Sequence, residues 1–115
     1  LEDCIEVGFD RILTSGQQPT AALGVDVISK LVNQAAGRII IMPGAGVNEQ
    51  SVEAIVSKTK ATEIHFSASR MRESLMTYRN SSISGMGSAE GAEFMIRTVD
   101  PERIRLIRKL AEQEE

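Results

Sequence analysis

Three short apolar runs, separated by little more than one helix each, constrain the fold of this chain more than any other feature. They occupy residues 11–15, 38–42 and 63–67, are rich in isoleucine, and each ends at small or glycine residues. Short runs bounded by turn-forming residues are typical of β-strands. Leucine or isoleucine residues near their centres lie 27 and 24 positions apart, so each interval has room for one helix and its connections.

The intervals between these runs carry helical patterns. Within residues 20–36 the apolar side chains recur every three or four positions and form one stripe, and Gly37 is placed to end that helix. Within residues 48–60 a shorter stripe follows Asn48, a favourable N-cap residue. Strands joined by crossover helices are parallel. The sequence therefore predicts an α/β fold with about three parallel strands and crossover helices.

The ends of the chain carry their own signals. Residues 1–8 read as the tail of a helix that begins upstream and stops at a glycine, so the chain is expected to start within a fold. Residues 79–88 are rich in Ser and Gly and are expected to form a loop, and residues 89–97 to hold one or two helical turns. Asp100 followed by proline predicts a last helix that runs to about residue 112.

A ligand is expected at the carboxyl ends of the three predicted strands. Parallel α/β sheets bind ligands there, and small side chains let a ligand approach the backbone closely. Gly44 and Gly46 also precede the N-terminus of a helix, where backbone N–H groups favour an anion. The alternative is that these glycines only make a tight strand-to-helix turn. The candidate ligand-binding residues at these ends are Thr14, Ser15, Gly16, Gly44, Gly46 and Ser67.

The third run places polar side chains on one face. Side chains alternate along a strand, so Glu63, His65 and Ser67 are expected to point into a barrel interior, with Ile64 and Phe66 toward the helices. His65 is the only histidine, and an imidazole suits a general base, a metal ligand or a hydrogen-bonded interior group. The sequence leaves these roles open, and Glu63 joins the candidate ligand-binding residues.

Metal ligation rests on two isolated side chains, His65 and Cys4. One histidine without nearby cysteines does not make a metal site, so further ligands would have to come from elsewhere in the fold. Cys4 lies beside charged residues in the first predicted helix, where a packing role is the first interpretation and thiolate ligation the alternative. The five methionines carry thioethers that suit Cu(I), yet they form no tight cluster and equally suit gap-filling in the core.

Composition narrows the class of partner. The net charge is −3, and the basic residues at positions 103–109 are flanked by glutamates, so we expect a solvated helix face and no nucleic-acid partner. No apolar run approaches the about 20 residues that span a bilayer, so no membrane partner is expected. A single cysteine allows no intrachain disulfide, which fits a reducing compartment.

Four segments, in the right order, resemble the CutC family of copper homeostasis proteins. They are residues 10–17 (DRILTSGQ), 41–47 (IMPGAGV), 61–68 (ATEIHFSA) and 78–82 (YRNSS). They are similar to the stretch around the family's sixth strand, its seventh-strand Met-Pro-Gly-Gly-Gly-Ile segment, its eighth strand and the loop that follows. The resemblance implies a (β/α)8 TIM barrel, a cytoplasmic location and copper as the bound ion. Two residues of the last segment, Arg79 and Asn80, join the candidate ligand-binding residues.

The resemblance has consequences for size and for one loop. A full barrel takes about 250 residues, so residues 1–115 are expected to form one domain, the C-terminal part of a partial (β/α)8 barrel. Ala45 stands where the family often has glycine, and an alanine fits there if its φ is negative. Strands cut from a barrel expose two edges. We therefore expect the isolated chain to be marginal, to aggregate, or to need a partner, which leaves a homo-oligomer open.

Three functional interpretations remain at this point. The first is a non-enzymatic copper homeostasis protein that binds copper ion. The alternative is an enzyme-like TIM-barrel fragment that binds a phosphate-containing or other anionic small molecule at the loops after strands 7 and 8. In that case His65 and Glu63 would carry out acid–base chemistry. The third interpretation is a fragment that has no activity of its own.

Overall fold

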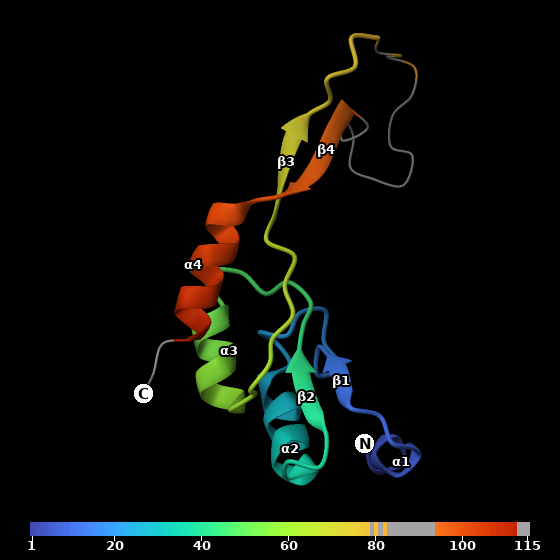
Figure 1. The fold of residues 1–115 in the computed structure, drawn as a ribbon, viewed down its shortest axis with the longest axis vertical. Coiled ribbons are helices and arrows are strands. Elements are labelled where there is room, and N and C mark those ends of the chain that lie inside the picture. Colours follow the sequence, from blue (N-terminus) through green and yellow to red (C-terminus); the bar gives the residue numbers. More distant parts are fainter. Residues whose placement is uncertain (79, 81, 83–93, 113–115) are drawn as a thin grey trace.

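The computed structural model describes residues 1–78, 80, 82 and 94–112, which form four helices and four strands in two separate sheets (Figure 1). In chain order the elements are α1 (Glu2–Val7), β1 (Arg11–Thr14), α2 (Val25–Ala35), β2 (Ile40–Pro43), α3 (Val52–Thr59), β3 (Ser69–Glu73), β4 (Met95–Val99) and α4 (Pro101–Ala111).

The strands β1 and β2 form the parallel pair that the sequence predicts. Arg11 lies opposite Ile40 at one end of the register and Thr14 lies opposite Pro43 at the other. The chain passes from β1 to β2 through α2, which packs against β2 and against α3 (Figure 1). This strand–helix–strand unit confirms the α/β class and the crossover helix between parallel strands.

An aliphatic core holds the helices to one face of this sheet. The sequence has three phenylalanines and no tryptophan, so the volume is filled by branched side chains. The residues with the largest fully buried apolar side chains are Ile28 of α2, Val52 and Ile55 of α3, and Ile107 of α4. Ile41 of β2 and Ile39, directly before that strand, belong to the same cluster. Every helix except α1 therefore contributes a buried residue to one core.

The helix ends follow the predicted signals, with shifts of a few residues. The side chain of Asp100 caps α4 by accepting hydrogen bonds from the backbone N–H groups of residues 102 and 103. The left-handed cap of α2 is Ala36 at φ 49°, one residue before the predicted Gly37. Asn48 is not the N-cap of α3, because the helix starts later, after Ser51, whose N–H donates to the Asn48 side chain.

The predicted third strand does not form. Residues 63–67 run beside β2 in an extended path, but a single backbone hydrogen bond joins them to it, from His65 N–H to Pro43 O at 2.9 Å. Proline has no N–H to donate to the neighbouring chain, so one hydrogen bond of a ladder is missing at this point. The parallel sheet of the described residues therefore has two strands, not three, with residues 63–67 lying along one edge.

A two-stranded antiparallel ribbon, which the sequence did not predict, precedes the last helix. Residues 69–73 pair with residues 95–99, so the helical turns predicted for 89–97 are wrong at Met95–Arg97, which belong to β4. Cross-strand pairing outweighs local propensity here. The loop predicted for residues 79–88 lies outside the described residues, except for positions 80 and 82. The ribbon extends the molecule to 54 × 32 × 23 Å (Figure 1).

The face of the parallel sheet that points away from the helices is uncovered. Leu13 of β1 points to this face and is 52% exposed, whereas its neighbour Ile12 packs against the core on the other side. Parallel sheets normally have both faces covered. The described part of the chain therefore forms a two-layer structure with one open sheet face.

Candidate functional site

Most of the candidate ligand-binding residues gather around one cavity at the carboxyl ends of β1 and β2. We call it the strand-end cavity, and its volume is about 450 Å³. Its lining comprises Leu13, Thr14, Ser15, Gly44, Ala45, Gly46, Val47, His65, Phe66 and Ser67. The structure thus brings three separate sequence segments together at the end of the sheet where the sequence predicts a ligand.

Gly44 sets the distance between the segments at this cavity. A Cβ atom at Gly44 would lie 2.4 Å from Cδ1 of Leu13 and 3.3 Å from Cβ of His65. Its N–H donates to the carbonyl of Thr14 at 3.0 Å, which continues the β1–β2 pairing by one step. The missing side chain therefore lets His65 lie against the end of β2. His65 is exposed there and lines the cavity.

The turn after Gly44 corrects an expectation about Ala45. Ala45 has φ 85° and Gly46 has φ 65°, so the negative φ at which an alanine would fit this position without strain is not the one observed. The carbonyl of Ala45 accepts a hydrogen bond from Ala21 N–H at 2.9 Å, which fixes the turn to the segment before α2. A non-glycine residue at positive φ costs about 1–2 kcal/mol, so this turn holds backbone strain beside the cavity.

Gly16 does not line the cavity, and its role is packing. Its missing Cβ would lie 2.3 Å from the carbonyl oxygen of Gly24, so the two glycines meet backbone to backbone. The hydroxyl of Thr14 accepts a hydrogen bond from Gly16 N–H at 3.0 Å. Both groups therefore shape the loop after β1, and Ser15 lies between them at the cavity.

Glu63 pairs with Arg11 and not with His65. Arg11 donates through Nε and Nη2 to the two carboxylate oxygens of Glu63, at 2.8 and 2.9 Å. These hydrogen bonds, together with the guanidinium charge, lower the pKa of Glu63. Glu63 is absent from the cavity lining. The predicted arrangement of Glu63 and His65 as neighbouring acid and base is therefore not assembled in this structure.

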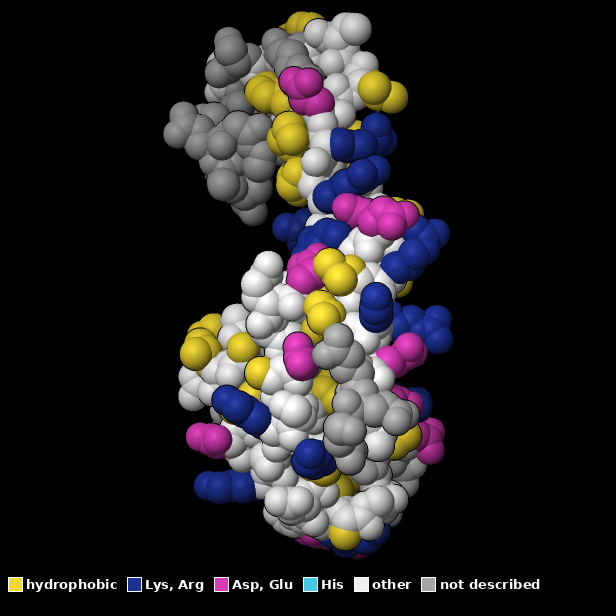
Figure 2. All heavy atoms as spheres, turned by 90° about the vertical axis from the view of Figure 1, so that its left-hand side faces the viewer, with side chains coloured by type: hydrophobic (Ala, Val, Ile, Leu, Met, Phe, Trp, Pro, Cys, Tyr) yellow, Lys and Arg dark blue, Asp and Glu magenta, His cyan; other side chains and the backbone are white. Residues whose placement is uncertain are grey.

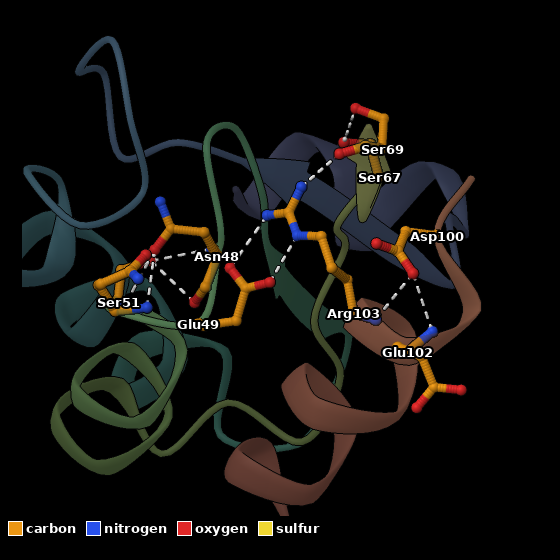
Figure 3. A network of polar contacts seen from close by, with 9 residues as sticks. Asn48, Glu49, Ser51, Ser67, Ser69, Asp100, Glu102 and Arg103 are labelled. Atoms are coloured by element: carbon orange, nitrogen blue, oxygen red, sulfur yellow. Dashed lines mark hydrogen bonds and ion pairs between the residues drawn. The ribbon is translucent and has the colours of Figure 1, made fainter. Parts of the chain in front are cut away.

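A network of polar contacts that sequence reasoning missed joins Glu49, Arg103 and Ser69 and reaches the cavity at Ser67 (Figure 3). Arg103 of α4 donates to both carboxylate oxygens of Glu49, with Nη2 to Oε2 at 3.0 Å, and also to the backbone carbonyl of Ser69. The Ser69 hydroxyl lies 3.5 Å from that of Ser67 at the cavity. The hydrogen bonds from Arg103 lower the pKa of Glu49. Arg103 was predicted to lie on a solvated helix face, and no local pattern in the sequence indicates its contact with Glu49, 54 positions away.

The two candidate metal ligands lie at opposite ends of the sheet. Cys4 belongs to α1, which precedes the start of β1, whereas His65 lies beside the carboxyl end of β2. A four-residue strand spans roughly 10 Å, and metal–ligand bonds are about 2 Å long, so these two side chains do not share an ion. Among the described residues, no group of three or more His, Cys, Asp or Glu side chains could hold a metal.

The remaining candidates lie away from the cavity or outside the described residues. Arg79 is not described. Asn80 is described, and its side chain accepts hydrogen bonds from the N–H and the hydroxyl of Ser82, at 3.0 and 2.6 Å. Of the methionines, Met42 lies in β2, and Met71 and Met95 lie on the ribbon. No helix in the described part of the chain has the length and apolar character needed to cross a membrane.

Comparison with known proteins identifies relatives over nearly the whole chain. A sequence model described as "CutC family" matches residues 1–70. The mouse protein named "Copper homeostasis protein cutC homolog" is 37% identical over 111 residues, which cover 96% of this chain and 41% of the mouse protein. The Parabacteroides distasonis protein named "family protein CutC" is 46% identical over 105 residues, 91% of this chain and 43% of its own length. The chain therefore spans about two fifths of the length of these relatives.

Proposed function

Because the chain belongs to the CutC family, we propose that it serves copper homeostasis as part of a protein that binds copper ion in the cytoplasm. The observation that carries this proposal is the family match over residues 1–70. Those residues include β1, β2 and every segment that lines the strand-end cavity. Relatives named for copper homeostasis cover the rest of the described chain as well.

We further propose that the parallel strands β1 and β2 are part of a (β/α)8 barrel. Two features support this architecture: the parallel β1–β2 pair with its crossover helix, and the extended segment 63–67 alongside β2. The open sheet face, on which Leu13 is 52% exposed, would then form one side of the barrel interior. The mouse relative has more than twice the length of this chain, which leaves room for the other strands.

His65 is the residue of the cavity best suited to contact copper. Its imidazole is a good ligand for copper, and its exposed position at the end of β2 leaves it accessible. A stable site needs additional donors, and Cys4 is too far away to supply one. Copper is therefore proposed as cargo that His65 binds at the cavity. The other metal ligands would come from outside the described residues.

Anaerobic titration with Cu(I) against a colorimetric chelator tests this proposal. The wild-type chain is expected to withdraw copper from the chelator, and His65→Ala to weaken that binding by about tenfold, which corresponds to 1.4 kcal/mol. Met42→Leu, a change of a soft donor elsewhere in the sheet, serves as the matched control and should bind as the wild type does. Equal binding by the wild type and His65→Ala would remove His65 as a ligand. If the wild-type chain bound no copper, the proposal that this part of the fold contributes to a copper site would be wrong.

A second candidate function, binding of a phosphate-containing or other anionic small molecule, is favoured by the cavity itself. Ser15 and Ser67 place hydroxyl groups around it, and the turn from Gly44 to Gly46 contributes backbone. The loops after the last strands of many barrels bind phosphate. Titration of the ¹⁵N-labelled chain with inorganic phosphate is expected to shift the amide signals of Gly44 and Gly46 and leave those of Gly8 and Gly37 unchanged. Uniform or absent shifts would remove this function.

A further inference from the structure

The β3–β4 ribbon brings together two methionines that lie far apart in the sequence. Met71 lies opposite Arg97, and Met95 lies opposite Glu73, two positions further along β3. Side chains alternate between the two faces of a strand, so these four residues share one face of the ribbon. On that face Met71 and Met95 are diagonal neighbours, whose Cα atoms lie about 7–8 Å apart. The sequence separates the two methionines by 24 positions and gives no sign of this pairing.

Neither methionine fills a gap in the core. Met71 is 46% exposed and Met95 37%. Among the described residues, the buried core and the apolar side chains packed against it include no methionine. Figure 2 shows hydrophobic side chains, the class in which methionine is drawn, at the surface of the narrow upper part of the molecule. Core packing, which the sequence left open beside Cu(I) ligation, therefore does not account for Met71 and Met95.

Two thioethers in this arrangement suit a soft metal ion. Methionine sulfur is a donor that selects Cu(I). Bonds from a metal to sulfur are about 2.3 Å long, so one ion between two sulfurs holds them at most about 4.6 Å apart. Methionine has three rotatable bonds, which lets both sulfurs reach this separation from Cα atoms about 7–8 Å apart. Rotation of the side chains therefore suffices to close a two-sulfur site without movement of the ribbon backbone.

The charges on this face of the ribbon offset each other. Glu73 and Arg97 flank the methionine pair and carry opposite charges. A thioether is itself neutral, so a bound ion keeps its positive charge and is held by the two sulfurs alone. Such a site binds more weakly than one built from thiolates, and its exposed position lets the ion leave. It therefore suits an ion that is passed on and not one that is stored.

The methionine pair lies on the face of the ribbon that leads toward the strand-end cavity. Ser69, which shares this face of β3 with Met71, has its hydroxyl 3.5 Å from that of Ser67 at the cavity. His65 lies beside β2, and the ribbon extends beyond the carboxyl ends of β1 and β2 (Figure 1). The two methionines are therefore placed apart from His65, at the same end of the parallel sheet.

From these observations we infer that Met71 and Met95 together form an exchangeable Cu(I) site on the ribbon, distinct from His65 at the strand-end cavity. The choice of copper rests on the proposed function, whereas the pairing of the two sulfurs rests on the register of β3 and β4. Ag(I) is soft, as Cu(I) is, and does not oxidise in air. It should therefore bind the same pair of thioethers.

Titration of the full chain with Ag(I), followed by NMR of ¹³C-labelled methionine methyl groups, tests this inference. The signals of Met71 and Met95 should shift together and saturate at the same Ag(I) concentration, whereas those of Met42 and Met76 should stay in place. Met71→Leu and Met95→Leu, which conserve side-chain volume, should each weaken Ag(I) binding by about tenfold or more. The double variant should lose little more than either single variant, because the ion needs both sulfurs.

Met76→Leu is the matched control, because Met76 is 68% exposed and lies outside the paired strands. It should bind Ag(I) as the wild type does, and circular dichroism confirms that each variant remains folded. A Met71 signal that shifts without that of Met95, an equal loss of binding in Met76→Leu, or no shift of either signal would overturn the inference.

His65→Ala separates this inference from the proposed role of His65. In that variant the Ag(I)-induced shifts of Met71 and Met95 should persist, even where competition with the chelator shows weaker Cu(I) binding. Loss of these shifts would mean that the methionines form no site of their own, which also overturns the inference. If His65→Ala instead competes for Cu(I) as the wild type does, the role of His65 fails, while paired shifts of Met71 and Met95 still support the ribbon site.

Discussion

Arg11 and Glu63, 52 positions apart in the sequence, are joined by two parallel hydrogen bonds at 2.8 and 2.9 Å. Arg11 starts β1, and Glu63 opens the extended segment on the other side of β2. The pair therefore links the two outer segments of the sheet region across the strand between them. This two-point geometry defines the relative position of the segments more closely than a single contact between point charges would.

The Arg11–Glu63 pair is expected to stabilise the position of residues 63–67. In a double-mutant cycle with Arg11→Met and Glu63→Gln, the effects on urea unfolding should be non-additive, and the coupling should shrink at about 500 mM NaCl because both groups are partly exposed. The helix-surface pair Arg105–Glu102, whose side chains are 69% and 83% exposed, provides the control and should show weaker coupling. Strict additivity for Arg11 and Glu63 would contradict the structural role of the pair.

The loss of folding stability at acid pH is expected to depend on Glu2. Hydrogen bonds from Arg38 and then Gln34 lower the pKa of Glu2 from 4.5 to about 2. The unfolded chain therefore binds the proton more readily than the folded chain between these two values. The contribution of Glu2 to stability is fully present above pH 4.5 and is lost as the pH falls toward about 2.

Titration of the Glu2 side-chain carboxyl by NMR checks this value directly. In Glu2→Gln, the fall in unfolding midpoint between pH 4.5 and about 2 should be shallower than in the wild type. Glu53, which is also exposed in the first turn of a helix, is the matched position for a Glu→Gln control. If the unfolding midpoint of Glu2→Gln fell with pH as steeply as that of the wild type, Arg38 would not form its hydrogen bonds with Glu2 in solution.

Sequence reasoning succeeded where a local signal and the final contact agree. The proline after Asp100 fixed the start of α4, and the apolar runs of β1 and β2 gave two strands whose parallel pairing is observed. It failed where the partner of a residue lies far away in the chain. Residues 63–67 have strand propensity, but Pro43 cannot return a hydrogen bond to them.

The candidate site shows the same division. Small residues at the strand ends predicted a ligand there; five of them, Thr14, Ser15, Gly44, Gly46 and Ser67, line the strand-end cavity, and binding of a ligand stays a prediction. Glu49 and Arg103 were missed because 54 positions separate them, and no local pattern announces their hydrogen bonds. Ala45 was misjudged because its positive φ follows from a tertiary contact, the hydrogen bond from Ala21.

The strained turn at Ala45 predicts a stabilising substitution. Ala45→Gly removes a cost of about 1–2 kcal/mol for positive φ. It also makes the unfolded chain more flexible, which lowers the stability of the fold by about 0.5–1 kcal/mol. The free energy of unfolding should therefore stay level or rise by up to about 1.5 kcal/mol. Ala54→Gly, at an exposed position inside α3, makes the same chemical change and should lower it by about 1 kcal/mol. Destabilisation by both would refute the strain at Ala45.

The link from Glu49 through Arg103 to Ser69 is expected to hold the base of the ribbon. Glu49→Gln keeps the shape of the side chain but removes the charge that orients Arg103. Amide hydrogen exchange should then accelerate in β3 and β4 and remain unchanged in β1 and β2. Glu53→Gln, on the exposed surface of α3, is the control. Equal acceleration throughout the chain would indicate global destabilisation and not release of the ribbon.

The last prediction comes from the contact between Gly44 and Leu13, because a side chain at Gly44 would have to displace the end of the Leu13 side chain. A Cβ there would lie 2.4 Å from Cδ1 of Leu13, and because this atom ends an exposed side chain that can rotate away, Gly44→Ala should destabilise the fold by only about 1 kcal/mol, the low end of the cost of overpacking. Leu13 is 52% exposed, so Leu13→Ala alone should cost less than about 1 kcal/mol. The double variant should be more stable than Gly44→Ala, because the clashing atom is gone. Urea unfolding of the four proteins measures this rescue. Failure of Leu13→Ala to rescue would place the clash at His65, whose Cβ lies 3.3 Å from the same position.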